Sequence, residues 1–118
     1  MPQSKKQEKR FRKFDDGKTK FGLIPPRAIK AIADVLTYGA NKYHAHNWCQ
    51  GADWSRYIDA MQRHINAWVC GEDIDPESGH HHLAHAGCCL LFLLSYQING
   101  IGKDDRIFHT IREASKKA

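Results

Sequence analysis

The stretch GEDIDPESGHHHLAHAGCCLLFLL, residues 71–94, decides the fold. Its second half is apolar nearly all round, which is typical of a helix buried at the centre of a small protein. Just before it, Asp75 stands at a capping position, Pro76 at the first helical position and Glu77 in the first turn. These signals predict that a central helix begins here and runs to about Asn99.

Three further segments have helical periodicity. Apolar residues recur at steps of three and four in residues 25–43 and 54–70, and residues 104–117 form an amphipathic segment that follows an aspartate cap. No stretch of useful length alternates polar and apolar residues as a strand would. The sequence therefore predicts the all-α class, as a compact bundle of about four helices in which the third, residues 75–99, is the central and buried one.

The net charge is concentrated at one end of the chain. Residues 1–20 hold eight basic and three acidic residues, which account for the whole net charge of +5. We therefore divide the chain into a basic N-terminal arm, residues 1–20, and a single helical domain, residues 21–118. Such an arm is either a solvated tail or a segment that attracts phosphate-bearing ligands or nucleic acid. Nucleic-acid binding is not favoured, because only Phe11 and Phe14 are interleaved with the basic residues.

The composition argues against several classes of protein. The longest apolar run, residues 90–94, is far shorter than the ~20 residues that cross a bilayer. The basic N-terminus lacks the apolar segment and cleavage site of a secretory signal. The four cysteines have no disulfide-framework spacing, so we expect reduced thiols and a cytoplasmic protein without a membrane span. Because a chain of this length has a small core, we also expect a homo-oligomer.

Two histidines are expected inside the central helix. His82 and His85 lie three residues apart and therefore share one face. An unpaired polar group in such a place costs on the order of several kcal/mol. Their partners are either the acidic residues Glu72 and Asp73 alone, or a metal ion that carboxylates and imidazoles hold together. For the second alternative the candidate metal ligands are Glu72, Asp75, His82 and His85.

An acid–base residue should accompany such a site. His64 lies about two turns before the end of the helix at residues 54–70, on the border of its buried side. At that position it fits a satisfied core histidine as well as a catalytic one. Glu77 is the other candidate, although its place near a helix start would explain it without any chemistry. We therefore name His64 and Glu77 as the candidate catalytic residues.

Basic and aromatic side chains nearby are suited to a nucleotide. Arg56 and Arg63 are seven residues apart on the polar side of one helix, where they either bind phosphate or belong to a solvated surface. Lys42, Asn47 and Trp48 offer groups for phosphate, base edge and base face. The same three residues would also fit a polar loop with one packing tryptophan.

Four segments together resemble a known family: GKTKFGLIPPRAIKAIADVLTYGANKY, NW, RYIDAMQRHINAW and the stretch quoted first. They are similar to the phage-encoded dATP/dGTP diphosphohydrolase N-terminal domain, which is grouped with the MazG-like all-α nucleotide pyrophosphohydrolases. The resemblance covers about residues 14–96. It implies a helical, oligomeric, divalent-metal-dependent hydrolase that cleaves a deoxynucleoside triphosphate between its α and β phosphates and releases a monophosphate and pyrophosphate.

The chain departs from the MazG-like pattern in its ligand types. MazG-like enzymes hold Mg²⁺ with carboxylates in an ExxE and an ExxD pair, whereas this chain places His82 and His85 on the third helix. Mg²⁺ prefers oxygen ligands, and imidazole suits Mn²⁺ and other transition metals. The expected cofactor is therefore a divalent metal, Mg²⁺ or Mn²⁺, with another transition metal as the alternative that the histidines introduce.

Two functions follow from these residues and the resemblance. In the first, a metal ion held by Glu72, Asp75, His82 and His85 activates a water that hydrolyses a purine deoxynucleoside triphosphate. Lys42, Arg56 and Arg63 would neutralise the phosphates. In the second, the chain binds a nucleotide without turnover and sequesters a cyclic or signalling nucleotide, for example in phage counter-defence.

Overall fold

The computed structural model describes residues 12–117, so residues 1–11 of the expected arm and Ala118 lie outside the described part. That part contains four α-helices and no strand, which confirms the all-α class. The elements in chain order are the 3-10 turn η1 (Phe21–Leu23), α2 (Pro26–Lys42), the 3-10 turn η2 (Asn47–Gln50), α3 (Trp54–Val69), α4 (His82–Asn99) and α5 (Ile107–Lys117). None of these helices is long and apolar enough to cross a membrane.

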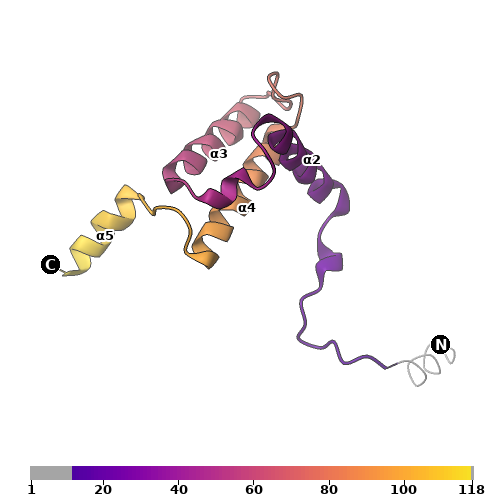
Figure 1. Ribbon diagram of the computed structural model, residues 1–118, viewed down its shortest axis with the longest axis horizontal. Coiled ribbons are helices and arrows are strands. Elements are labelled where there is room, and N and C mark those ends of the chain that lie inside the picture. The colour runs from indigo at the N-terminus through magenta and orange to yellow at the C-terminus, as the bar shows by residue number, and fades with distance from the viewer. Residues whose placement is uncertain (1–11, 118) are drawn as a thin grey trace.

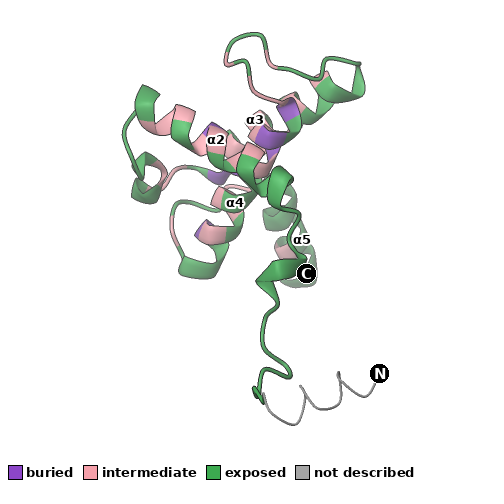
Figure 2. Cartoon of the chain, turned by 90° about the vertical axis from the view of Figure 1, so that its right-hand side faces the viewer, coloured by how far each residue is buried: buried purple, intermediate pink, exposed green. Residues whose placement is uncertain are grey.

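Helix α4 is the centre of the packing. It lies against both α2 and α3, and α5 stands apart from these three (Figure 1). Burial is concentrated where the three helices meet, whereas the segment before α2 and the helix α5 are exposed (Figure 2). The expectation of a central, buried third helix is therefore confirmed, and the bundle proper consists of α2, α3 and α4.

Small residues on α4 let α2 approach closely. Val35 of α2 forms the buried cluster with Ala84 and Cys88 of α4. Beside them, a Cβ placed on Gly87 would lie 2.7 Å from Cδ1 of Ile32, closer than side-chain atoms pack. Because Gly87 has no side chain, α2 can lie close to α4 at this point.

An aromatic cluster fixes the turn η2 to α4. The ring of Trp48 stacks on Phe92, with centroids 5.0 Å apart and planes 21° from parallel. The hydroxyl of Tyr96, which is fully buried, donates a hydrogen bond of 2.6 Å to the carbonyl oxygen of Trp48. Tyr57 of α3 completes the cluster against the same two α4 rings. The connection between α2 and α3 is therefore held on α4 through both the backbone and the side chain of Trp48.

The start of α4 is where the sequence prediction is wrong. Asp75, Pro76 and Glu77 do not open the helix, which begins at His82. Residues 75–79 instead form a single turn in which the Gly79 N–H donates to the Asp75 carbonyl oxygen at 2.8 Å. Gly79 then adopts a φ of +76°, in the left-handed region, and an α-helix cannot continue through that conformation. The true N-cap is His81, whose ring nitrogen Nδ1 accepts the N–H of Leu83 at 3.0 Å.

The connection after α4 is tied to the beginning of α3. The N–H of Trp54 donates to the Lys103 carbonyl oxygen at 2.9 Å, and the indole N–H of Trp54 donates to the Ile101 carbonyl oxygen at 3.0 Å. Asp105 accepts two bonds from Ser55, at 2.8 Å from the backbone N–H and 2.5 Å from the hydroxyl. Helix α5 begins directly after this fixed segment and leads away from the bundle (Figure 1).

Gly102 in this connection gives a test of the fold. Its φ is +78°, and a Cβ there would collide with the carbonyl oxygen of Ala52. Gly17 has nearly the same φ, +79°, but nothing lies within 4 Å of its Cβ position. Gly102→Ala should lower the free energy of unfolding by about 2 kcal/mol or more, and the matched control Gly17→Ala by no more than about 1 kcal/mol. Chemical denaturation measures both, and equal losses would show that the connection is not a fixed element.

Candidate functional site

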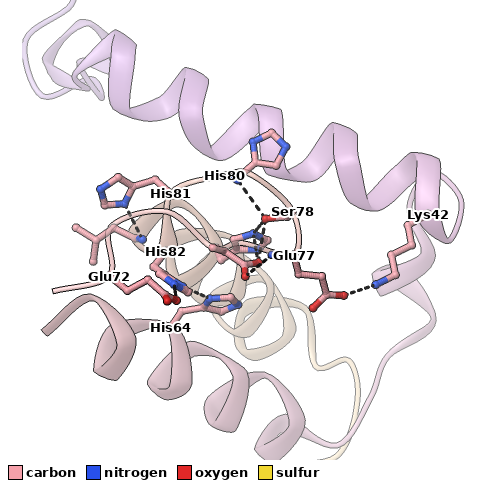
Figure 3. A network of polar contacts seen from close by, with 11 residues as sticks. Lys42, His64, Glu72, Glu77, Ser78, His80, His81 and His82 are labelled. Atoms are coloured by element: carbon pink, nitrogen blue, oxygen red, sulfur yellow. Dashed lines mark hydrogen bonds and ion pairs between the residues drawn. The ribbon is translucent and has the colours of Figure 1, made fainter. Parts of the chain in front are cut away.

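The loop between α3 and α4, residues 70–81, closes over a group of imidazoles. His64 comes from α3 and His82 from the start of α4 (Figure 3). His85 belongs to the same first turn of α4. The loop adds the carboxylates of Glu72 and Asp75. Most residues singled out from the sequence as ligands or bases therefore do meet in one place, although they are spread over the chain from His64 to His85.

A first chain of contacts runs through three side chains. Nε2 of His82 lies 2.7 Å from Oε1 of Glu72, and Nδ1 of His82 lies 2.8 Å from Nδ1 of His64. His82 is only 5% exposed, and both of its ring nitrogens have a partner. The burial of a polar ring in an apolar helix is thus compensated by hydrogen bonds on both sides.

The partners fix the positions of the protons. A carboxylate can only accept, so the Nε2 of His82 carries a proton and donates it to Glu72. In the neutral ring the Nδ1 of His82 is then an acceptor, and the Nδ1 of His64 must donate to it. Neutral His64 consequently has its lone pair on Nε2, and no described residue forms a hydrogen bond with that atom. The chain Glu72–His82–His64 therefore leaves an available basic nitrogen at its end.

A second chain of hydrogen bonds holds His85. The Ser78 hydroxyl donates to Oδ2 of Asp75 at 2.9 Å, and the Ser78 oxygen lies 2.7 Å from Nε2 of His85. Because the single hydroxyl proton is used on Asp75, the Ser78 oxygen accepts from His85. Nε2 of His85 also lies 3.4 Å from Oδ2 of Asp75. His85 is therefore protonated on Nε2, and in its neutral form the lone pair is on Nδ1.

The stacking of His64 on His85 joins the two chains of hydrogen-bonded side chains. The rings of His64 and His85 are 4.4 Å apart between centroids and only 6° from parallel. Two imidazolium rings in this arrangement would repel each other, so at most one of them is expected to carry a charge. The stack therefore favours neutral histidines.

Burial and charge act in the same direction on these groups. Burial lowers the pKa of His64 below its ordinary value of 6.5, and His82 lowers it further, against an opposing effect of Asp75. Burial likewise lowers the pKa of His85, with His64 as the second cause. Burial raises the pKa of Asp75, but the hydrogen bonds from Ser78 and the Glu77 N–H outweigh this and leave it below its ordinary value. Near neutral pH the rings of His64 and His85 are thus neutral beside an ionised Asp75.

The four expected metal ligands are divided into pairs. Glu72 binds one nitrogen of His82 and Asp75 lies beside one nitrogen of His85. Within residues 12–117 no three histidine, cysteine, aspartate or glutamate side chains converge in a way that would hold a metal ion. Acidic partners do lie against both histidines, and Asp75 rather than Asp73 is the one beside His85. A single shell of Glu72, Asp75, His82 and His85 around one ion is not formed by these side chains.

Glu77 lies at the edge of the site. Its carboxylate is directed away from the imidazoles toward Lys42 at the end of α2, with 3.4 Å between Oε1 and Nζ (Figure 3). Both side chains are largely exposed, so this pair contributes little to stability. His80 faces Tyr38 of α2, with ring centroids 5.5 Å apart. Of the two candidate bases, only His64 belongs to the imidazole group.

The expected substrate-binding residues are spread over the surface. Arg56 and Arg63 are on the exposed side of α3, and Arg63 borders a shallow, open depression together with Asp59, Gln62 and Asn66. Asn47 is exposed at the start of η2. Trp48 uses one ring face to pack on Phe92, which is the packing role that the sequence left open. Only Lys42 of this set reaches the loop of the histidine site directly.

Ser78 is the functional candidate that sequence reasoning missed. It holds Asp75 and His85 and also accepts the N–H of His80 at 3.2 Å. The available signal was Gly79, because a glycine after Pro-Glu-Ser ends a turn and directs the chain back on itself. That reversal places Ser78 beside the helix that follows rather than within it.

Comparison with known proteins identifies relatives of this chain. Residues 8–106 match the family described as dATP/dGTP diphosphohydrolase, N-terminal. A protein of Salmonella phage PMBT28 named dATP/dGTP diphosphohydrolase is 42% identical over 94 residues. That alignment covers 80% of this chain and 32% of the relative, so the chain spans about a third of the relative's length. No solved structure matches.

The lowered histidine pKa values predict how stability depends on pH. The unfolded chain binds protons on His64 and His85 near pH 6.5, whereas the folded chain binds them only at lower pH. The stability present above pH 6.5 should therefore be lost as the pH falls through the folded pKa values. Thermal denaturation should show a Tm that falls as the pH is lowered from about 8 to about 5. His64→Gln should reduce the slope of Tm against pH. A matched change outside the site, His109→Gln, should leave the slope as it is; a Tm independent of pH would contradict the assignment.

Proposed function

The chain belongs to the dATP/dGTP diphosphohydrolase N-terminal family, and we propose that it hydrolyses a purine deoxynucleoside triphosphate between the α and β phosphates. The products would be a nucleoside monophosphate and pyrophosphate. The family match covers most of the chain, and the name of the phage relative supports this activity. Because the chain spans only a third of that relative, its activity is our inference and rests on the geometry of the site.

The observation that carries the proposal is the chain Glu72–His82–His64. It orients the His64 ring through Nδ1 and leaves Nε2 as a proton acceptor. The lowered pKa of His64 keeps this nitrogen unprotonated near neutral pH. A base that is oriented by a second group, which is in turn held by a carboxylate, is the arrangement that general-base catalysis uses.

The proposed step is attack of water on phosphorus. Nε2 of His64 takes one proton from the water while the water oxygen forms a bond to the α phosphorus. The bond from that phosphorus to the bridging oxygen breaks, and this oxygen leaves with pyrophosphate. His64 then carries a positive charge, which the contact with His82 and the carboxylate of Glu72 stabilises. The stacked His85, held neutral by its surroundings, adds no opposing charge to that state.

Positive groups around the site are proposed to receive the phosphates. Lys42 lies against Glu77 at the edge of the loop, and a phosphate oxygen can replace the Glu77 carboxylate as its partner. Arg56 and Arg63 offer further positive charge on α3, and we assign the base contacts to Asn47 and Trp48. These four assignments rest on residue type and on position in the fold.

A divalent cation enters the proposal with the substrate. Mg²⁺ or Mn²⁺ bound to the triphosphate offsets the charge of its oxygens, as in other phosphoryl-transfer reactions. Glu72 and Asp75 are engaged with histidines, so we assign no step to an ion held by the protein. We also propose that the chain forms a homo-oligomer and acts in the cytoplasm, which is that of the host cell if the chain is phage-encoded.

A nucleotide panel tests the activity. Purified protein incubated with each deoxynucleoside triphosphate and Mg²⁺ or Mn²⁺ should release monophosphate and pyrophosphate, with dATP and dGTP turned over fastest. Denaturing the protein after incubation distinguishes turnover from storage. Recovery of unchanged nucleotide in a stoichiometric amount would support a sequestering protein instead. If the protein showed no binding and no turnover, both functions would be refuted.

Substitutions in the chain of contacts test its role. His64→Gln and Glu72→Gln should each lower kcat by on the order of 100-fold and change KM little, because both act on the transition state more than on binding. Removing His64 should also abolish the acidic limb of the pH–rate profile. His109→Gln is the matched control and should keep wild-type kinetics. If His64→Gln retained both the rate and the pH profile, the base would have to be another group.

A further inference from the structure

The hydroxyl of Ser78 lies between a carboxylate and the ring of His85. It donates to Oδ2 of Asp75 at 2.9 Å. Its oxygen accepts the N–H of His80 at 3.2 Å and lies 2.7 Å from Nε2 of His85. A hydroxyl has one proton to donate and two lone pairs, so these three partners use all of its hydrogen-bonding capacity. The Ser78 side chain is therefore held in one orientation, and it holds the nitrogen of His85 in turn.

His85 is bonded at its edge and stacked on its face. The side chains of His85 and Asp75 are each only 15% exposed, so the Ser78 hydroxyl binds Nε2 in a place that water reaches poorly. The ring of His64 lies nearly parallel to that of His85, with centroids 4.4 Å apart. A parallel stack is a contact of two faces. Rotation of the His85 ring would therefore disrupt the stack, and the bond to Ser78 opposes that rotation.

A single hydrogen bond does not fix the plane of the His64 ring. The contact of 2.8 Å between Nδ1 of His64 and Nδ1 of His82 holds one atom of the ring. The ring can still tilt about that contact, and a tilt changes the direction in which the lone pair of Nε2 points. The face of His85 opposes the tilt. The direction of the basic nitrogen thus depends on two supports, His82 at the edge of the ring and His85 at its face.

We propose that Ser78 is a positioning residue that acts on His64 through His85. Asp75 takes the hydroxyl proton, which leaves the Ser78 oxygen to accept from Nε2 of His85 and to keep that ring in the stack. The effect on rate rests on the proposed function, whereas the effect on ring orientation rests on the contacts alone. A displacement of about 1 Å at a reacting group can lower a rate on the order of 100-fold, so a residue that acts only through others can matter for turnover.

Proton NMR of the full chain tests the ring positions without requiring turnover. The ring protons of His64 lie near the face of His85, and their signals should be shifted by that neighbouring ring. Ser78→Ala should move these signals toward the values of an unstacked histidine, whereas Ser78→Thr retains a hydroxyl and should keep them near those of the wild type. Ser95→Ala is the control, because it removes a hydroxyl roughly three turns further along α4. It should leave the His64 signals unchanged.

Steady-state kinetics test the effect on rate. Ser78→Ala should lower kcat on the order of tenfold with little change in KM, because the hydroxyl acts on the orientation of the base rather than on substrate binding. Ser78→Thr should restore most of the lost rate, and Ser95→Ala should keep wild-type kinetics. A Ser78→Ala protein with wild-type kcat, or one whose KM rises while kcat stays the same, would overturn the positioning role.

The two measurements separate positioning from a purely structural role. If Ser78 only stabilised the loop, Ser78→Ala would lower Tm but leave the His64 signals and kcat as they are, and the proposal would be refuted. If the wild type showed no turnover, the proposed function would fail, and the NMR signals would still decide whether Ser78 fixes the two rings. Should Ser78→Ala fail to fold, Ser78→Cys gives the same test, because a thiol is only a weak donor and acceptor. Unchanged His64 signals in that variant would overturn the proposal.

Discussion

A polar ring buried in an apolar helix must be given hydrogen-bond partners, and this requirement organises the molecule. His82 is nearly inaccessible to water, so both of its nitrogens have to be satisfied by protein groups. One partner is His64, which sets how α3 lies against α4; the other is Glu72, which sets how the loop returns from α3. The same contacts decide which nitrogen of His64 is free. Structural stability and the proposed chemistry thus rest on one set of hydrogen bonds.

The helices and the meeting of the two histidine-bearing segments could be predicted from the sequence. Periodicity places α2 and α3 within a residue of their observed bounds, and two imidazoles on an apolar helix correctly indicated acidic partners. The start of α4 could not be predicted, because Asp75 and Pro76 give the same local signals for a helix and for a single turn. Only the left-handed conformation of Gly79, which depends on where the loop must go, separates the two.

The details of the site were beyond sequence reasoning for a similar reason. A list of donor residues does not say whether carboxylates and imidazoles share a metal ion or bind one another. Nor does it say which carboxylate reaches which ring, and the structure pairs Glu72 with His82 and Asp75 with His85. The sequence likewise predicted a buried α4 but not that Leu90 and Leu94 on it would stay more than half exposed. Apolar residues indicate burial without saying whether the covering surface belongs to the same chain.

The protonation states of the ring nitrogens are the most direct test of the account. Nitrogen-15 NMR of the histidine side chains near neutral pH distinguishes the two tautomers of each ring and the charged form. We expect His82 to be protonated on Nε2, and His64 to be protonated on Nδ1 with a bare Nε2. A proton on Nε2 of His64 under these conditions, in either the neutral or the charged ring, would contradict the claim that the Glu72–His82 pair prepares His64 as a base.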